Sequence, residues 1–537
     1  MIFDILIANG TVVDGTGKPA FRGDIGIAGD RIVEIGNMYL ASARTRIDAE
    51  GMIVSPGFID MHTHSDLSLL DHPGGESKAY QGVTTEVTGN CSWTPFPAGK
   101  LGPKELRASL GSTLRSKVEW DWSTLDAWAS RMETNGISLN VAPQVGQGGI
   151  RAAVNLKERR DPTPDEMKEM KYLLSEALEQ GAFGMTTGLT VAPSMYASTD
   201  EIVELAKVMR SHYGAYYATH ARLWPGGHVN AVREAVEVGK RAAVPVQYSH
   251  IAIIDRRMYG RGDEMTVVID KARDEGLDIT CDMYPYTAAG HGLSQILPDW
   301  VQEGGVPAMV KRLRDPQQRR RAAEETEHGT PDTEARDWLW PRIFIAEIGT
   351  GKNLKYVGMT IAQIAKERNV EPAEAVVALI EEEENNVRVV THNRIETDVT
   401  YFLTYEQSMI GSDGNAVDPS GLMAISKPHP RFYGTYPRIL GKYVRGEKVM
   451  TLEKAIYKMT GFPAKRLTLK DRGVIARGKV ADVVVFNPST ITDMATFDDP
   501  QKYAVGVQHL LVNGTPVIAN GKHTAIRAGK VLRRGKD

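Results

Sequence analysis

The sequence predicts an α/β protein whose core is a (β/α)8 TIM-like barrel, with a small β domain built from both chain ends. Two observations lead to this prediction. The middle of the 537-residue chain alternates short apolar strands with amphipathic helices, the pattern of parallel βαβ units. Both ends instead carry β-branched residues in rough alternation, punctuated by Asn-Gly, Asp-Gly and Gly-Asp turns. A doubly wound open sheet is the alternative for the middle of the chain.

The segments at the two chain ends have the same β-rich sequence pattern. FDILIANGTVVDG and DIGIAGDRIVEIG open the chain, and ADVVVF and HLLVNGTPVIANGK recur near its end. We therefore expect residues 1–57 and 471–537 to form one sheet domain. Two unrelated β appendages are the less economical alternative.

Residues 58–470 are expected to form the barrel, with an insertion or lid near 286–345. Helices are expected at DEMKEMKYLLSEALEQG, TDEIVELAKVMRSHYG and VNAVREAVEVGKRAA. The charged stretch at 311–340 reads as a solvated helical part of the insertion. The candidate strands are GFIDMH, TTEVTGN, SLNVAPQV, GAFGMTTG, GAYYATH, VPVQYSH, LDITCDMYP and SMIGSD, with RVVTHN as a ninth.

Composition excludes several classes of protein. Hydrophobic residues make up 42% and charged residues 24% of the chain, as in ordinary globular proteins. The net charge of −3, with Lys and Arg scattered, gives no footprint for nucleic acid. No apolar run is long enough to span a membrane, and MIFDILIANG lacks the features of a secretory signal. Two cysteines do not suggest a disulfide framework, so we expect a cytoplasmic protein. The sequence leaves the oligomeric state open, and a homo-oligomer is one of the alternatives.

His62 and His64 are the sharpest local signal for a metal site. They stand in GFIDMHTHSD, directly after an apolar strand. Side chains at i and i+2 of a strand share a face, so both imidazoles can reach one ion. This position is also the carboxyl end of the first barrel strand, where barrel active sites are built.

Three more candidates end expected strands: Cys91 in TTEVTGNC, His220 in AYYATH and His250 in VPVQYSH. Each alone would more often be structural, and Cys281 reads as a small buried side chain. The recurrence of one placement at several strand ends favours a shared metal site. Asp413 in MIGSDG ends a late strand and completes the set; thiolate, imidazole and carboxylate together suit zinc.

With these residues in place, the chain resembles the amidohydrolase superfamily and, within it, the D-aminoacylase (N-acyl-D-amino-acid deacylase) family. The resemblance runs nearly end to end. It includes NGTVVDGTG, SPGFIDMHTHSD, GVTTEVTGNC, GLTVAPSMYAS, YATHAR, VQYSH, DMYPYTA, MIGSDG, HPRFYGTYPRIL and ADVVVFNP. The resemblance implies a distorted (β/α)8 barrel with a β-sandwich domain, and a zinc enzyme that hydrolyses linear, non-peptide amides of small molecules.

The resemblance also implies roles for the metal residues. Cys91, His220 and His250 would hold a tight zinc, with Cys91 in place of the bridging carboxylated lysine that many amidohydrolases carry on strand four. A second site, weak or empty in this family, would use His62, His64 and Asp413. Asp413 would act as general base and then as acid.

The resemblance also implies substrate-binding residues: Tyr284 of DMYPY and Arg431 of HPR match the positions where the family binds the substrate carboxylate. A structural salt bridge is the alternative role for Arg431. The chain also departs from the family pattern: Ala252 stands where a Lys is usual, Gly290 where a Ser is usual, and GNCG becomes GNCSW.

Because the substrate-facing residues differ, we expect an amide substrate that is larger or aromatic, with Trp93 and Trp224 near the mouth of the site. Two other functions stay open. A cyclic amidohydrolase acting on hydantoin- or dihydropyrimidine-like rings is disfavoured by the strand-two Cys and by the lack of a strand-four Lys. A non-catalytic scaffold paralogue is disfavoured because every expected metal residue is present.

Overall fold

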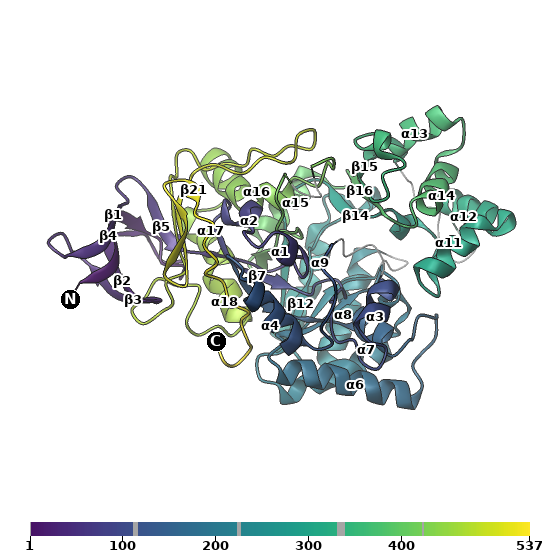
Figure 1. Ribbon diagram of the computed structural model, residues 1–537, viewed down its shortest axis with the longest axis horizontal. Helices are drawn as coiled ribbons and strands as arrows, with labels where there is room; N and C mark the ends of the chain where they lie inside the picture. The colour runs from purple at the N-terminus through teal and green to yellow at the C-terminus, as the bar shows by residue number, and fades with distance from the viewer. Residues whose placement is uncertain (1, 111–115, 223–226, 330–338, 421–423) are drawn as a thin grey trace.

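The computed structural model describes residues 2–110, 116–222, 227–329, 339–420 and 424–537. Its mixed content of helices and strands confirms the predicted α/β class. Three regions follow one another in Figure 1: strands from both termini, a central α/β region, and a helical region formed by α11–α14 (Val306–Arg314, Pro316–His328, Ile361–Arg368, Pro372–Glu382).

The central region contains two parallel sheets. One has the order β17-β13-β12-β11-β10-β9, and the other the order β6-β7-β8. All eight middle segments predicted as barrel strands are confirmed as strands. Their bounds are β6 (Phe58–Asp60), β7 (Val83–Thr88), β8 (Asn140–Pro143) with β9 (Val145–Gly146), β10 (Gly184–Gly188), β11 (Tyr216–His220), β12 (Val246–Tyr248), β13 (Ile279–Met283) and β17 (Ser408–Ile410).

Hydrogen bonds also join the two parallel sheets at both of their edges. On one side the Phe183 N–H donates to the Pro143 carbonyl oxygen (2.8 Å). On the other, the Met61 N–H donates to the Ile410 carbonyl oxygen (3.2 Å). Side chains from both sheets share one buried cluster, with members on β6, β7, β8, β11 and β17: Ile59, Val87, Ala142, Ala218 and Met409.

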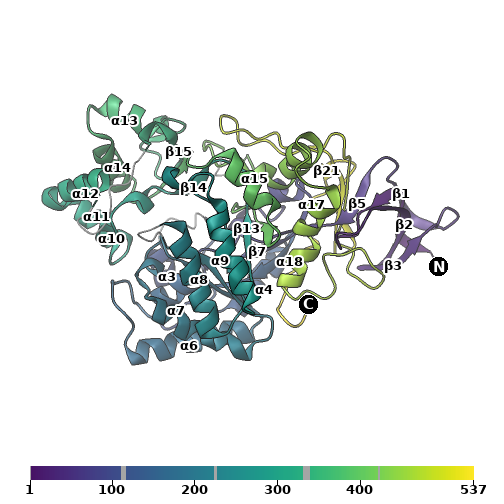
Figure 2. The ribbon, with the colours of Figure 1, turned by 180° about the vertical axis from the view of Figure 1, so that it is seen from behind.

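Helices after the strands cover the parallel sheets, and Figure 2 shows α7 (Thr199–Ala206), α8 (His228–Ala242) and α9 (Gly262–Asp274) on one side of the region. The helix predicted at DEMKEMKYLLSEALEQG is α6 (Pro164–Glu179). Its start follows from a capping box in which Thr163 and Glu166 satisfy each other's backbone N–H groups, with Pro164 at the first position.

Strands from both chain ends form one nine-stranded sheet. β1 (Phe3–Val12), β2 (Phe21–Ala28), β3 (Arg31–Gly36), β4 (Ala43–Asp48) and β5 (Ile53–Pro56) join β18 (Val483–Phe486), β19 (Val507–Val512), β20 (Thr515–Ala519) and β21 (Lys522–His523). The two ends meet where β18 pairs antiparallel with β5. The final residues return to the central region, where the Leu532 N–H donates to the Val141 carbonyl oxygen (2.7 Å).

RVVTHN, the ninth candidate, is β16 (Val387–Thr391), which lies outside the parallel sheets. It pairs antiparallel with β14 (Ala289–Gly292) and β15 (Ile343–Ile348) in a separate three-stranded sheet. This sheet packs with α11–α14 in its own buried cluster, which extends from Leu293 to Val389.

Part of the charged stretch, residues 330–338, lies outside the described residues. Within the described ranges no helix is long and apolar enough to cross a membrane.

Candidate metal centre

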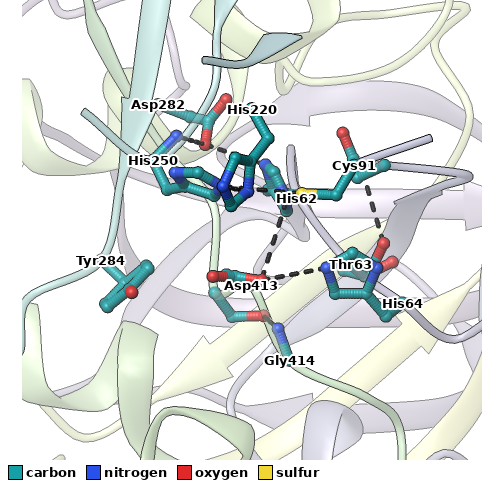
Figure 3. Close-up of polar contacts among 12 residues, drawn as sticks. His62, Thr63, His64, Cys91, His220, His250, Asp282, Tyr284, Asp413 and Gly414 are labelled. Carbon is teal, nitrogen blue, oxygen red and sulfur yellow. Dashed lines mark hydrogen bonds and ion pairs between the residues drawn. The ribbon is translucent and has the colours of Figure 1, made fainter. Parts of the chain in front are cut away.

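The predicted metal residues gather at the carboxyl ends of the parallel strands (Figure 3). Two groups place their ligand atoms within 4.8 Å of one another: His62 with Cys91 and His250, and His62 with His64 and Asp413. His62 belongs to both groups. The sixth residue, His220, lies beside them, with its Nδ1 2.9 Å from His250 Nε2.

Three of these residues have backbone conformations that L-residues rarely adopt. Cys91 has φ 52°, His250 has φ 35° and Asp413 has φ 52°. Positive φ at non-glycine residues costs free energy and gathers at functional sites. The strand ends are thus bent so that these side chains turn toward a common point.

Glycine makes room for the backbone at Cys91. A Cβ added to Gly188, the last residue of β10, would lie 2.3 Å from the Cys91 carbonyl oxygen, and one added to Gly146 would lie 2.1 Å from the Ser92 carbonyl oxygen. The Ser92 N–H donates to Thr186 Oγ1 (3.1 Å). The bend after β7 is therefore packed directly against β9 and β10.

The electrostatics of the cluster favour a thiolate. Burial raises the pKa of the Cys91 thiol, but the neighbouring imidazoles of His62 and His220 outweigh burial and hold this pKa well below its usual value. Cys91 is 7% exposed. The thiolate is the form of cysteine that binds metals.

Asp413 is held as a carboxylate. Burial opposes its ionisation, but the charge of Arg431 and the hydrogen bond with His64 hold the pKa of this carboxyl well below its usual range. Its Oδ1 lies 3.0 Å from His64 Nε2 and 3.8 Å from His62 Nε2, and its Oδ2 lies 3.1 Å from Arg431 Nη1. An ionised carboxylate in this position can accept a proton.

Asp282 orients two of the candidate ligands, and the sequence did not single it out. Its Oδ1 lies 3.2 Å from His62 Nδ1 and accepts the His250 N–H (2.8 Å), while Gln247 Nε2 donates to its Oδ2 (2.8 Å). A carboxylate on the remote nitrogen of an imidazole fixes the ring so that the other nitrogen faces the metal. The available signal was its place near the end of β13, two residues before Tyr284.

A second missed group lies beneath the ligands. The fully buried Lys78 donates to Asp60 Oδ2 (2.8 Å) and contacts Glu86 and Ser412. Asp60 Oδ1 accepts the N–H groups of His62 (3.3 Å) and Ser412 (2.8 Å). One ammonium therefore ties together β6, β7 and the end of β17, the strands that precede His62, Cys91 and Asp413.

The cluster opens into a cavity of about 810 Å³. Its walls include His64, Cys91, His220, Asp413, Trp93 and Arg431 from the central region and Glu347, Ile348 and Val389 from the insertion. Trp93 thus lies where it was expected, although it is 7% exposed. Trp224 lies outside the described residues.

Tyr284 and Arg431 are brought together beside the cluster. The Arg431 guanidinium carbon lies 4.5 Å from the centre of the Tyr284 ring, and both residues are 1% exposed. Arg431 Nη2 donates to the Gly290 carbonyl oxygen (3.3 Å). Through its contact with Asp413, Arg431 links Tyr284 to the metal groups.

Known proteins are similar to this chain in sequence and in structure. Residues 45–244 and 412–518 match the model of the family described as Amidohydrolase family. A D-aminoacylase from Alcaligenes xylosoxydans xylosoxydans is 35% identical over 532 residues, which cover 99% of this chain and 98% of that protein. The chain is also similar to a solved N-acyl-D-glutamate deacylase from Bordetella bronchiseptica, complexed with zinc and a phosphonate inhibitor (TM-score 0.83, 30% identity, 99% of this chain and 100% of that chain).

A solved D-aminoacylase with a binuclear metal centre gives a TM-score of 0.81 at 32% identity, covering 99% of this chain and 100% of that chain. The match is therefore nearly end to end both in sequence and in structure. The chain belongs to the amidohydrolase family.

Proposed function

We propose that this protein is a zinc-dependent hydrolase of linear amide bonds and that its substrates are N-acyl-D-amino acids. The observation that carries the proposal is the pair of ligand groups that share His62 at the strand ends. The relatives support the substrate class, because the D-aminoacylase and the N-acyl-D-glutamate deacylase are named for it.

We further propose that the eight parallel strands close into a distorted (β/α)8 barrel. The hydrogen bonds that join β8 to the start of β10 and β6 to β17, and the side-chain cluster shared by both sheets, support this closure. The barrel would span residues 58–470, with the β-sandwich domain formed by 1–57 and 471–537. The insertion would extend to about residue 391, where β16 ends.

The cluster fits a zinc ion. Tetrahedral zinc with Zn–N near 2.0–2.1 Å and Zn–S near 2.3 Å separates its ligand atoms by about 3.3–3.6 Å. His62 Nε2 lies 3.3 Å from Cys91 Sγ, and Cys91 Sγ lies 3.5 Å from His250 Nε2. Cys91, His220 and His250 would hold the tight ion. His62, His64 and Asp413 would form the second, weaker site, with His62 also close to the first.

Zinc bound there would polarise the amide carbonyl and lower the pKa of water to about 7. Asp413, already ionised, would accept a proton from water at Oδ1 and return it to the departing nitrogen. This proton transfer turns the amide nitrogen into a good leaving group, because an amine leaves readily only when it is protonated. His64 and Arg431 hold the carboxylate in place from its two oxygens.

Arg431 and Tyr284 would also bind the substrate carboxylate, which is attached to the carbon next to the amide nitrogen. Nε of Arg431 is buried and has no hydrogen-bond partner among the described residues. A guanidinium fork suits a carboxylate, because it can donate two parallel hydrogen bonds. Trp93 on the cavity wall supports an apolar or aromatic acyl group.

A substrate panel tests the proposal. The zinc-loaded protein should hydrolyse N-acyl-D-amino acids faster than their L-isomers, and aromatic acyl groups should be accepted. Turnover of hydantoins or dihydropyrimidines, with N-acyl-D-amino acids untouched, would support the cyclic amidohydrolase instead. A protein without stoichiometric zinc and without turnover would be a scaffold.

We place the enzyme in the cytoplasm, because both cysteines are unpaired thiols and Cys91 must stay reduced to bind metal.

A further inference from the structure

Arg394 follows β16 at the base of the insertion, and its side chain reaches back to Tyr284 of the central region. Its Nη2 donates to Tyr284 Oη (2.7 Å), and its guanidinium carbon lies 4.4 Å from the centre of the Tyr284 ring. The Arg394 backbone N–H also donates to the Thr287 carbonyl oxygen (3.2 Å). Its contacts therefore lie at the end of the site where the substrate carboxylate is proposed to bind.

Two guanidinium groups thus contact one phenol, since Arg431 lies 4.5 Å from the same ring centre. The two differ in their counter-ions. Arg431 has Asp413 at 3.1 Å, whereas no carboxylate of the described residues lies within 4.0 Å of an Arg394 side-chain nitrogen. Nε of Arg394 is also buried with no hydrogen-bond partner among the described residues. A partly buried cation with an unused donor is a costly arrangement that an anion would relieve.

The hydrogen bond to Tyr284 sets the direction of the phenol. Because Arg394 can only donate, the phenol oxygen must be the acceptor, and its own hydrogen stays available for another group. An ionised carboxylate only accepts hydrogen bonds, so it is the complementary partner for that hydroxyl. The hydrogen bond from Arg394 therefore leaves the Tyr284 hydroxyl free to act as a donor.

We propose that Arg394 determines specificity for substrates with a free carboxylate, by positioning the Tyr284 hydroxyl and by adding a second positive charge to that end of the site. The inference rests on the proposed function, since it concerns the carboxylate of an N-acyl-D-amino acid. A purely structural role, tying the insertion to the chain after β13, is the alternative. The backbone hydrogen bond to Thr287 provides that connection whatever the side chain is.

Matched substrates separate the two roles. We compare N-acetyl-D-methionine with N-acetyl-D-methioninamide, which lacks only the negative charge. Arg394→Met should raise KM for the acid by about 10- to 100-fold, the range expected for loss of a hydrogen bond involving charge. KM for the amide should change by less than about twofold. Arg394→Lys should fall between wild type and Arg394→Met for the acid, because it keeps the charge but loses the planar fork.

Two further variants complete the experiment. Lys104→Met removes an exposed cation from the cavity wall, and it should leave the ratio of KM values for acid and amide unchanged. In a Tyr284→Phe background, Arg394→Met should raise KM for the acid by less than about threefold, because the two residues act together. Equal losses on acid and amide, or an undiminished loss in the Tyr284→Phe background, would overturn the inference.

Calorimetry distinguishes failure of this inference from failure of the proposed function. Zinc-loaded wild type should bind N-acetyl-D-methionine more tightly than the amide, and Arg394→Met should remove that preference. If the preference is present but neither compound is hydrolysed, the proposed hydrolysis is wrong and the inference stands. If wild type hydrolyses both but binds them equally, the inference is wrong and the hydrolase stands.

Discussion

His62 is the residue on which both metal groups depend. It lies 3.3 Å from Cys91 Sγ through Nε2 and 3.2 Å from Asp282 Oδ1 through Nδ1, and it is fully buried. Both ring nitrogens are thus committed, one to the candidate ligands and one to an orienting carboxylate. Sequence alone could predict His62 as a ligand, because HTH follows an apolar strand. It could place Asp282 near the end of a strand but could not pair it with His62, because an aspartate within a strand pattern carries no sign of the histidine across the sheet.

Asp413→Asn separates proton transfer from metal binding. The amide keeps the shape of the carboxylate but cannot accept the proton, so turnover should fall by about 10²- to 10⁴-fold. Zinc at Cys91, His220 and His250 should be retained, which elemental analysis of the purified variant measures alongside initial rates. Near-normal turnover with full zinc would show that another group is the base.

At the scale of single elements, the end of β10 controls the position of Cys91. Gly188→Ala would place a Cβ within 2.3 Å of the Cys91 carbonyl oxygen, which is backbone and cannot rotate away. We expect the bend after β7 to move, the zinc affinity to fall and the free energy of unfolding to drop by about 1–3 kcal/mol. Chelator competition and denaturant unfolding measure these two effects.

Gly292→Ala is the matched control, because an added Cβ there would meet only Ser294 Oγ at 4.0 Å. It should leave zinc affinity and stability near those of wild type. If Gly188→Ala binds zinc as tightly as Gly292→Ala does, the packing between β10 and the Cys91 bend does not set the ligand geometry.

The elements that could be predicted are those with strong local patterns. Eight apolar runs followed by polar residues gave all eight parallel strands. RVVTHN has the same pattern, yet β16 pairs antiparallel in the insertion. Strand periodicity reports that a strand is half-buried or buried and says nothing of its partner. For the same reason the sequence pattern does not fix the end of the proposed insertion, whose buried cluster includes residues as far as Val389.

At the scale of the whole molecule, the stability should depend on pH through His228 at the start of α8. Its Nε2 accepts the Ile254 N–H (3.0 Å), and burial lowers its pKa from 6.5 to about 4. The unfolded chain therefore binds a proton more tightly than the folded chain does. The resulting stabilisation is present above pH 6.5 and is lost as the pH falls through about 4; its upper size is about 3 kcal/mol.

His228→Gln removes this titration while offering an oxygen to the Ile254 N–H. We expect the fall in melting temperature between pH 7 and pH 4.5 to be smaller in the variant than in wild type, measured with the same metal content at both pH values. An identical fall in both proteins would mean that His228 is not held neutral.

The two chain ends are the part of the whole molecule that the sequence anticipated best. β5 and β18 are more than 400 residues apart and pair directly, so that β1–β5 and β18–β21 form one sheet. The final segment then packs Leu532 into the cluster beneath the parallel strands. This return could not be predicted, since its apolar residues are few and have no strand period.

X-ray absorption at the zinc edge of the purified protein reports the atoms around the ion, and so shows whether Cys91 binds it. Wild type should show one sulfur near 2.3 Å together with nitrogen or oxygen near 2.0–2.1 Å, and Cys91→Ser should lose the sulfur. Zinc surrounded only by nitrogen and oxygen in wild type, or protein without stoichiometric zinc, would mean that the Cys91 cluster is not a zinc site.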